Sequence, residues 1–323
     1  MRKELVQAAL HHMNPERMPL VYFNGDQSNS DILLVDVVDH HLPKGEFTVS
    51  EWGFVWDSRD GTMGQVAEPV LSSMEDLSSY KCPSPFDERR YEAIEDFRER
   101  FGEDRYYIAS FGLSGFTIMT LLLGFTEVLE MLALEDKRIN HLADMVFEFE
   151  EDVIKHLPKY GFDGVAFFDD WGTQTNLILS PAMWRSFYLP RYKRQFELAH
   201  KLGLTVYFHS CGYIEAIIDD LIDAGVDFLN LSQPNLYDLK RVGDRYGGRV
   251  CFVSPISYQT TSIKGSDTDI WKEAEQIITS LGGPGKAVIG YLEEYEAIGL
   301  STHNYKTCEK AFQVLGAYSH CNN

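Results

Sequence analysis

A histidine and a cysteine separated by one residue follow a predicted strand. Residues 205–208 are β-branched and aromatic, which favours a buried strand, and His209-Ser210-Cys211 comes directly after them. Side chains two positions apart on a strand point to the same side, so an imidazole nitrogen and a sulfur are offered to one point, as a zinc site requires. A packed cysteine beside a hydrogen-bonded histidine is the alternative, and the triplet alone is compatible with both.

Two adjacent carboxylates, Asp169 and Asp170, end another predicted strand at residues 164–168. An ionised carboxylate beside an apolar strand is costly unless it meets a cation, a metal or hydrogen-bond donors. We therefore expect at least one of them to serve a site, with helix capping in a solvated loop as the alternative. Gln174 follows in the same loop and can orient a polar ligand. We assign Asp169, Asp170 and Gln174 to the catalytic centre.

Polar residues also follow other predicted strands, and we expect them to share the same edge. Those assigned to substrate binding are Asn24, Asp26, Gln233 and Tyr291, and two further acids, Glu293 and Glu294, follow the last strand. Active groups of a parallel α/β barrel lie on the loops at the carboxyl ends of its strands, so residues after different strands meet there.

The elements that hold these residues alternate between strand and helix from residue 106 to the end. Strands are predicted at 18–23, 106–110, 164–168, 205–208, 226–231, 249–253 and 286–291, and the principal helices at 87–101, 116–124, 126–134, 136–160, 181–202, 214–222, 236–246, 267–281 and 305–318. Such alternation favours a single-domain (β/α)₈ TIM barrel over residues 1–323. Seven strands are clear, residues 31–38 fit helix or strand, and an eighth strand is inferred.

The amino-terminal part carries an insertion in this pattern. Residues 47–56 and 62–69 alternate like a hairpin broken at Asp60-Gly61. The first 20 residues form an amphipathic helix and a turn, without the apolar core of a signal peptide, and no apolar run approaches the roughly 18 residues of a membrane span. Together with five scattered cysteines, these features predict a cytoplasmic protein without a membrane partner.

Charge excludes one class of partner. The formal net charge of −20 argues against a nucleic-acid surface, which needs clustered Lys and Arg. No glycine-rich phosphate loop follows a predicted strand, and no serine nucleophile elbow is present. We therefore expect a small-molecule substrate rather than a nucleic acid or a nucleotide.

Three blocks of sequence resemble the uroporphyrinogen decarboxylase superfamily, and within it the cobamide-dependent methyltransferases more than the porphyrin decarboxylases. The blocks are EWGFVW at 51–56, DGVAFFDDWGTQTNLILSP at 163–181 and HSCGYIEAIIDDLIDAGVDFLNLSQP at 209–234. The resemblance implies a TIM barrel with its site at the carboxyl mouth, in agreement with the alternation of strands and helices.

The resemblance also implies a cofactor and a partner. Methyltransferases of this type hold zinc with a His-x-Cys pair and a distant second cysteine, and the zinc activates a thiol that takes a methyl group from a methylcobamide on a separate corrinoid protein. His209 and Cys211 match the first two ligands. The third does not match, because Glu293 or Glu294 stands where the distant cysteine is expected. Zinc accepts carboxylate oxygen, so either glutamate is a candidate for the third ligand. Cys251 is the other cysteine on a predicted barrel strand, but its place near the start of that strand is better explained by packing.

We therefore predict a zinc-dependent methyltransferase that moves a methyl group between a corrinoid protein and a thiol or small methylated compound. The alternatives are a metal-free lyase of the uroporphyrinogen decarboxylase type and a non-catalytic binder of a corrinoid or tetrapyrrole. Asp26 keeps the lyase open, because an acid at the end of the first strand belongs to the decarboxylase pattern. However, Asp26 is an acid at a position where a cation would be needed to bind the carboxylates of a porphyrin.

Overall fold

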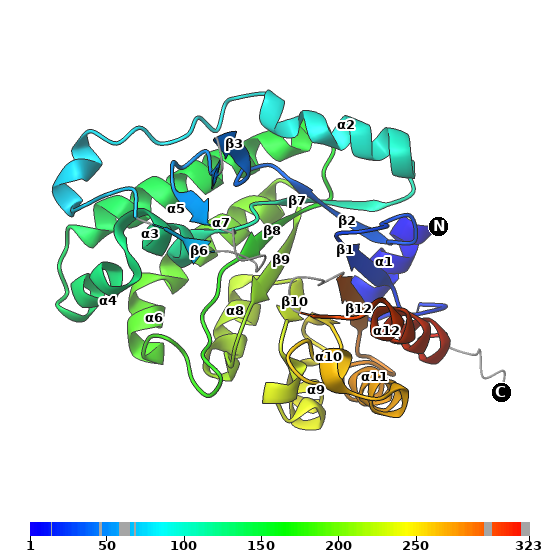
Figure 1. Ribbon diagram of the computed structural model, residues 1–323. Coiled ribbons are helices and arrows are strands. Elements are labelled where there is room, and N and C mark those ends of the chain that lie inside the picture. The colour runs from blue at the N-terminus through cyan, green and yellow to red at the C-terminus, as the bar shows by residue number, and fades with distance from the viewer. Residues whose placement is uncertain (14, 45–46, 58–64, 68, 294–298, 318–323) are drawn as a thin grey trace.

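Eight parallel strands close into a barrel in the computed structural model of this chain (Figure 1). The structure describes residues 1–323 except 14, 45–46, 58–64, 68, 294–298 and 318–323. Around the barrel the strands are β1 (Leu20–Phe23), β12 (Val288–Glu293), β11 (Cys251–Ser254), β10 (Phe228–Leu231), β9 (Thr205–Ser210), β8 (Gly164–Phe168), β7 (Tyr106–Ser110) and β2 (Ile32–Asp36). The predicted TIM barrel is confirmed.

Helices cover the outside of the barrel and, in the case of α1, its amino-terminal end. They are α1 (Arg2–Leu10), α2 (Arg89–Phe101), α3 (Gly115–Leu123), α4 (Phe125–Ala133), α5 (Ile139–His156), α6 (Pro181–Phe187), α7 (Leu189–Lys201), α8 (Ile218–Ala224), α9 (Leu239–Tyr246), α10 (Thr261–Lys264), α11 (Asp267–Leu281) and α12 (Thr302–Leu315). Short 3₁₀ helices are η1 (Met74–Ser78), η2 (Leu157–Tyr160), η3 (Glu215–Ile217) and η4 (Pro234–Leu236).

Successive side chains along each strand point alternately into the barrel and toward the surrounding helices, which divides the core into an inner and an outer part. On β9, Tyr207 packs in a cluster inside the barrel, while Val206 and Phe208 pack in the larger cluster under the helices. Because side chains alternate with a period of two, His209 faces inward like Tyr207. The pairing of Phe168 with His209 on β8 and β9, and of His209 with Asn230 on β9 and β10, sets these side chains at one level.

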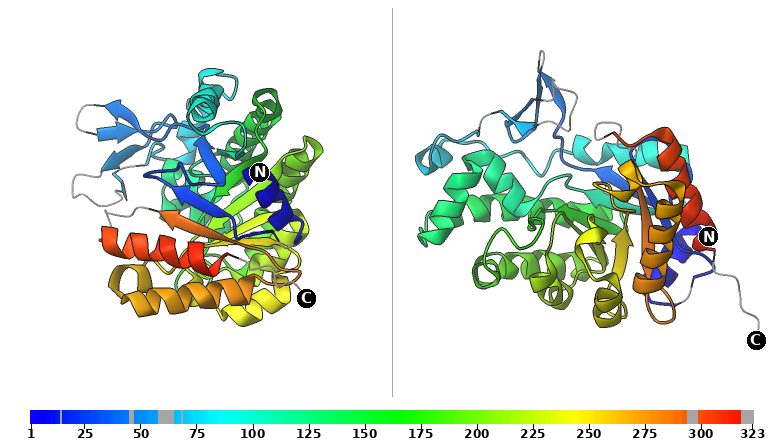
Figure 2. Two further views of the ribbon diagram at one scale, coloured as in Figure 1. Left: turned by 90° about the vertical axis from the view of Figure 1, so that its right-hand side faces the viewer. Right: turned by 60° about the horizontal axis from the view of Figure 1, so that its bottom comes forward.

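The eighth strand is β2, which sequence periodicity left undecided between strand and helix. Its five residues ILLVD pair in parallel with all of β7, from Ile32 beside Tyr106 to Asp36 beside Ser110. The region after β2 forms a separate antiparallel sheet of β3 (Leu42–Lys44), β4 (Phe47–Val49), β5 (Val55–Asp57) and β6 (Gln65–Val66). This sheet projects from the barrel (Figure 2) and contains the predicted hairpin, whose break at Asp60-Gly61 lies outside the described residues.

Two predicted helices differ from those observed. The helix predicted at 181–202 is divided at Tyr188 into α6 and α7, and Pro190, which has no N–H to donate, occupies the first turn of α7. Ser180 caps α6 as predicted, accepting a hydrogen bond from the backbone N of Met183. The helix predicted at 214–222 begins as η3 and continues as α8. Among the described residues, no single helix is long and apolar enough to cross a membrane, although α3 and α4 together pass that test with a 109° bend.

The amino-terminal helix packs against the barrel interior. Val6 and Ala9 of α1 are fully buried and belong to the same cluster as Tyr106 and Phe228, which stand at the starts of β7 and β10. This helix therefore covers the amino-terminal end of the barrel. The opposite end, where the strands finish, is the mouth.

Candidate metal centre

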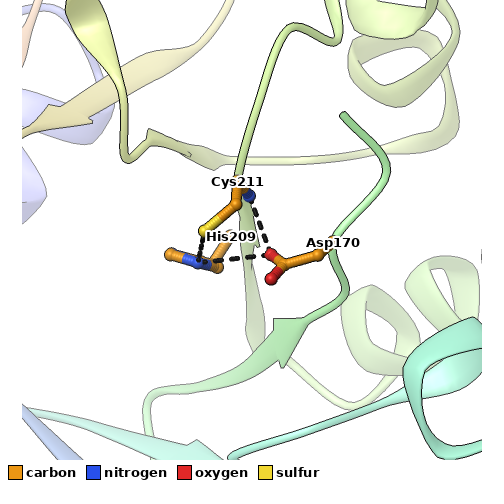
Figure 3. A group of neighbouring side chains, drawn as sticks. All are labelled: Asp170, His209 and Cys211. Atoms are coloured by element: carbon orange, nitrogen blue, oxygen red, sulfur yellow. Dashed lines mark hydrogen bonds and ion pairs between the residues drawn. The ribbon is translucent and has the colours of Figure 1, made fainter. Parts of the chain in front are cut away.

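Asp170, His209 and Cys211 converge at the mouth (Figure 3). His209 Nε2 lies 3.6 Å from Cys211 Sγ and 3.6 Å from Asp170 Oδ1, and one ligand atom from each residue lies within 4.8 Å of the others. Tetrahedral zinc with Zn–N and Zn–O bonds of about 2.0 Å and a Zn–S bond of about 2.3 Å separates its ligand atoms by about 3.3–3.5 Å. The imidazole, thiol and carboxylate therefore fit one zinc ion in chemistry and spacing.

The neighbouring strand orients the histidine. His209 Nδ1 lies 2.5 Å from Asn230 Oδ1, and Asn230 Nδ2 donates to the carbonyl of Val253 at 2.9 Å. Because the amide uses its N–H on Val253, its oxygen must accept, and His209 Nδ1 must carry the proton. The lone pair is then on Nε2, which faces Cys211 and Asp170. A hydrogen bond at the far nitrogen is the usual support of a metal-binding histidine.

Contact between two loops brings Asp170 beside Cys211. The backbone N of Gly172 donates to the carbonyl of Cys211 at 3.1 Å, and the backbone N of Cys211 donates to Asp170 Oδ1 at 2.8 Å. Gly212 has φ +77°, and a Cβ there would lie 2.1 Å from the carbonyl carbon of Gly172. Only a residue without a side chain permits this approach, so the glycines fix the spacing of the two loops.

The surroundings of Cys211 keep its thiol protonated in the absence of a cation. Burial and the nearby carboxylates of Asp170 and Glu293 raise the pKa of Cys211 to about 12, while a hydrogen bond from Ser232 Oγ, at 3.3 Å, opposes that rise. Such a thiol is a poor nucleophile at neutral pH. A bound cation would favour the thiolate, for which Ser232 already supplies a donor.

The side chain of Asp169 points away from this group, toward the amino terminus of α3. It is fully buried and accepts hydrogen bonds from the backbone N of Phe116 and Thr117, from Thr117 Oγ1 and from Tyr192 OH. Burial raises the pKa of Asp169 to about 7 against the effect of these donors. Its contacts anchor the amino terminus of α3, the structural role that was the alternative for this pair of acids, and Asp170 is the one that faces His209.

The other predicted site residues surround the mouth at different depths. Gln233 accepts a hydrogen bond from the backbone N of Gly212 at 2.7 Å and so supports the loop of Cys211. Gln174 is exposed in the turn between Gly172 and Leu177, and Asp26 is exposed and accepts from the backbone N of Ser28. These observations give Gln233 a structural contact, while the substrate roles of all three stay predictions.

The predicted third metal ligand is on the far strand. Glu293 is buried on β12 and accepts hydrogen bonds from Asn24 Nδ2 at 3.2 Å and Tyr291 OH at 3.1 Å. Among the described residues it is not part of the group formed by Asp170, His209 and Cys211. Glu294 lies outside the described residues. Asp170 is thus the carboxylate that the structure places beside His209 and Cys211, and ligation by Glu293 is an untested prediction.

Sequence reasoning missed three polar residues of the mouth: Asn230, Ser232 and Asp36. Asn230 is a polar residue in the otherwise apolar strand FLNL. That exception was the signal in the sequence that could have indicated its pairing with His209. Asp36 accepts a hydrogen bond from Ser110 at the ends of β2 and β7. Cys251 is buried in the barrel interior, in agreement with the packing role predicted for it.

A closed parallel barrel with imidazole, thiol and carboxylate donors at its carboxyl mouth is the architecture of a TIM-barrel enzyme. A sequence profile described as uroporphyrinogen decarboxylase (URO-D) matches residues 51–290, so the chain belongs to this family. No curated protein matches the sequence.

A solved structure supports the fold. A methyltransferase from Methanosarcina mazei has 16% sequence identity and a TM-score of 0.69, covering 97% of this chain and 98% of its own. A D-psicose 3-epimerase from Clostridium cellulolyticum H10 has 9% identity and a TM-score of 0.49, covering 92% and 98%. The chain thus has a URO-D-family enzyme fold that resembles a methyltransferase.

Proposed function

We propose that this protein is a zinc-dependent methyltransferase that moves a methyl group between a corrinoid protein and a thiol or small methylated compound. The observation that carries the proposal is the convergence of Asp170, His209 and Cys211 on one point, with Asn230 holding the proton on the remote nitrogen of His209. The resemblance of the fold to a methyltransferase supports it at the level of architecture.

The three side chains would hold zinc through His209 Nε2, Cys211 Sγ and an Asp170 carboxylate oxygen. With three protein ligands, a zinc ion keeps an open position, as catalytic zinc does, and it would act there as a Lewis acid that lowers the pKa of a bound thiol. Ser232 donates a hydrogen bond to Cys211 Sγ, and the loop around Gly212 keeps Cys211 in place. The corrinoid would be brought to the mouth by a separate protein.

The charge at the mouth disfavours the lyase alternative. The residues that face inward at the ends of the eight barrel strands are Phe23, Asp36, Ser110, Phe168, His209, Asn230, Val253 and Glu293. Two are acids and none is Lys or Arg. A porphyrin carrying several carboxylates would need cations at these positions, so the mouth is a poor binding site for it.

Metal content is the decisive measurement. We expect plasma mass spectrometry on protein purified without a His tag to find about one zinc per chain in the wild type and in Glu293→Ala, and little in Asp170→Ala, His209→Ala and Cys211→Ala. Zinc-loaded wild type should then demethylate methylcobalamin in the presence of a thiol. Wild-type protein without zinc, or carboxylated porphyrin decarboxylated without metal, would contradict the proposal.

A further inference from the structure

The loop after β9, which carries the candidate metal ligand Cys211, is held between the loops after β8 and β10. On the β8 side, the backbone N of Cys211 donates to Asp170 (Figure 3), and its carbonyl accepts from the backbone N of Gly172. On the same side, the backbone N of Tyr213 donates to the carbonyl of Thr173 at 2.8 Å. The odd-numbered residues of this loop thus pair on the β8 side.

Two residues after β10 pair the even-numbered positions. The backbone N of Gly212 donates to Gln233 Oε1 at 2.7 Å, and its carbonyl accepts from Tyr237 OH at 2.7 Å. The same hydroxyl accepts a hydrogen bond from the backbone N of Ile214 at 3.0 Å. Gln233 and Tyr237 therefore hold the β10 side of the loop, and Tyr237 bridges two of its residues.

The hydroxyl of Tyr237 has a defined role in each of its hydrogen bonds. A backbone N–H can only donate and a carbonyl can only accept, so the phenol oxygen accepts from Ile214 and the phenol proton goes to Gly212. Burial raises the pKa of Tyr237, which keeps that proton in place. Ile214, Gly212 and Tyr237 are all buried. Without the hydroxyl, a buried donor and a buried acceptor would lose their partners, and the loop could recover them only by moving.

Movement of this loop would displace the sulfur of Cys211, because Gly212 follows it directly. Ser232, another residue after β10, donates a hydrogen bond to Cys211 Sγ at 3.3 Å. The β10 side thus contacts both the sulfur and the backbone next to it. A zinc site requires its ligand distances within about 0.2 Å of their ideal values, so small shifts of Sγ relative to His209 matter.

We propose that Tyr237, assisted by Gln233, is a positioning residue of the metal centre that fixes Cys211 Sγ relative to His209 and Asp170. This inference rests on the zinc site of the proposed function. Both residues act through the backbone of the loop after β9, as outer-shell partners of a metal ligand do.

The test compares Tyr237→Phe with Tyr213→Phe. The rings of Tyr213 and Tyr237 stack with centroids 5.2 Å apart, but the hydroxyl of Tyr213 donates to Glu215 Oε2 at 2.6 Å. Each variant keeps its ring and loses one hydroxyl, and only Tyr237→Phe breaks the bridge. Competition with a chromophoric chelator should show zinc binding weakened about tenfold or more in Tyr237→Phe and unchanged in Tyr213→Phe.

Cobalt(II) in place of zinc reports the geometry of the ligands. The thiolate-to-cobalt charge-transfer band should shift or weaken in Tyr237→Phe and match the wild type in Tyr213→Phe. Gln233→Met, which removes the other contact with Gly212, should also weaken zinc binding and provides a second test should Tyr237→Phe not fold. Thermal unfolding of the metal-free proteins monitors the fold of each variant.

A purely structural role for Tyr237 has a different signature. A folded Tyr237→Phe protein with a lower unfolding temperature but the zinc affinity and cobalt spectrum of the wild type would overturn the inference. The zinc site of the proposed function would then stand. Wild-type zinc affinity in Gln233→Met would equally count against the β10 side as the support of Cys211. Failure of the wild type to bind zinc or cobalt would contradict both the inference and the proposed function.

Discussion

A single amide decides which nitrogen of His209 is available to a metal. The oxygen of Asn230 accepts from Nδ1 because its N–H is already donated to Val253. We expect Asn230→Ala to lower zinc affinity about 10- to 100-fold, since the imidazole loses the partner that fixes its tautomer and rotation. Competition with a chromophoric chelator measures this change.

Asn140 on α5 provides the control for this substitution. Its Oδ1 accepts a hydrogen bond from Arg191 Nη2 at 2.9 Å, a contact between α5 and α7 on the outside of the barrel. Asn140→Ala should therefore keep the zinc affinity of the wild type. A wild-type affinity in Asn230→Ala would show that the tautomer is not fixed by this amide.

At the scale of single residues, Asp169 and Asp170 show how much of the site could be predicted from the sequence. The strand end at residues 164–168 identifies Asp169 and Asp170 as a costly pair of carboxylates. Which one faces the mouth depends on donors distant in sequence: Asp169 meets Thr117 and Tyr192, and Asp170 meets Cys211. No local pattern contains that information, so Asp170 as the partner of His209 and Cys211 emerged only from the fold.

At the scale of elements, the loops after β8 and β9 meet through Gly172 and Gly212. Gly203 has the same φ of +77° as Gly212, but a Cβ there would meet nothing within 4 Å. We expect Gly203→Ala to cost about 1 kcal/mol from backbone strain alone and to keep its zinc. Gly212→Ala adds the collision with Gly172, so it should cost more and lose zinc as well. Urea unfolding and metal content measure both effects.

The opposite result for zinc would show that metal binding does not depend on the contact between these two loops. Zinc retained at wild-type level in Gly212→Ala would mean that Asp170 reaches His209 without the close contact of the two loops. The proposed role of this contact in setting the spacing would then be wrong, whatever the loss in stability.

The amino terminus of α3 is bound by two buried acids. Asp169 accepts from Phe116 and Thr117, and Glu150 of α5 accepts from the backbone N of Gly115 at 2.8 Å and from Gln195 at 2.6 Å. Burial raises the pKa of Asp169 to about 7 and that of Glu150 to about 8. Both acids hold a proton more strongly in the folded chain than in the unfolded chain.

This raised pKa gives a pH dependence with a definite sign. The stabilisation is fully present below the unfolded pKa values near 4 and is lost as pH rises through about 7 and 8. Glu150→Gln removes one titrating group, so between pH 5 and 8 the free energy of unfolding of this variant should fall by about 3 kcal/mol less than that of the wild type. Urea unfolding at several pH values tests this expectation.

An exposed glutamate of the same helix is the control for that titration. Glu148→Gln on α5 removes a solvent-facing carboxylate two residues before Glu150 and should leave the pH dependence nearly as in the wild type. Parallel curves for Glu150→Gln and the wild type would mean that Glu150 does not carry the effect.

For the whole molecule, α1 covers the end of the barrel opposite the metal centre. Val6 is fully buried among interior residues of the barrel. Val6→Ala should therefore lower the free energy of unfolding by about 2 kcal/mol through lost apolar contact and a small cavity. Zinc content should not change, since the ligands belong to the other end. Loss of zinc in a folded Val6→Ala protein would contradict this separation of the two ends.

Barrel architecture was largely predictable from the sequence because its signals are local. The strands at 106–110 and 164–168 and the helix at 267–281 have the predicted bounds. The strand β2 was ambiguous because ILLVD is too short to show a period, and its pairing with β7 decides it. The division of 181–202 into α6 and α7 follows Pro190, a signal visible in the sequence but outweighed by the helical pattern around it.

The helix at the closed end has a consequence for the order of events. With α1 packed into the amino-terminal end of the barrel, the mouth is the end from which a small ligand and a carrier protein would both approach. Under the proposed function, a docked corrinoid protein would cover that opening, so the small compound has to enter first and its product has to leave after the carrier separates. Compulsory-order kinetics, with the carrier as the second substrate to bind, would be the steady-state signature of this geometry.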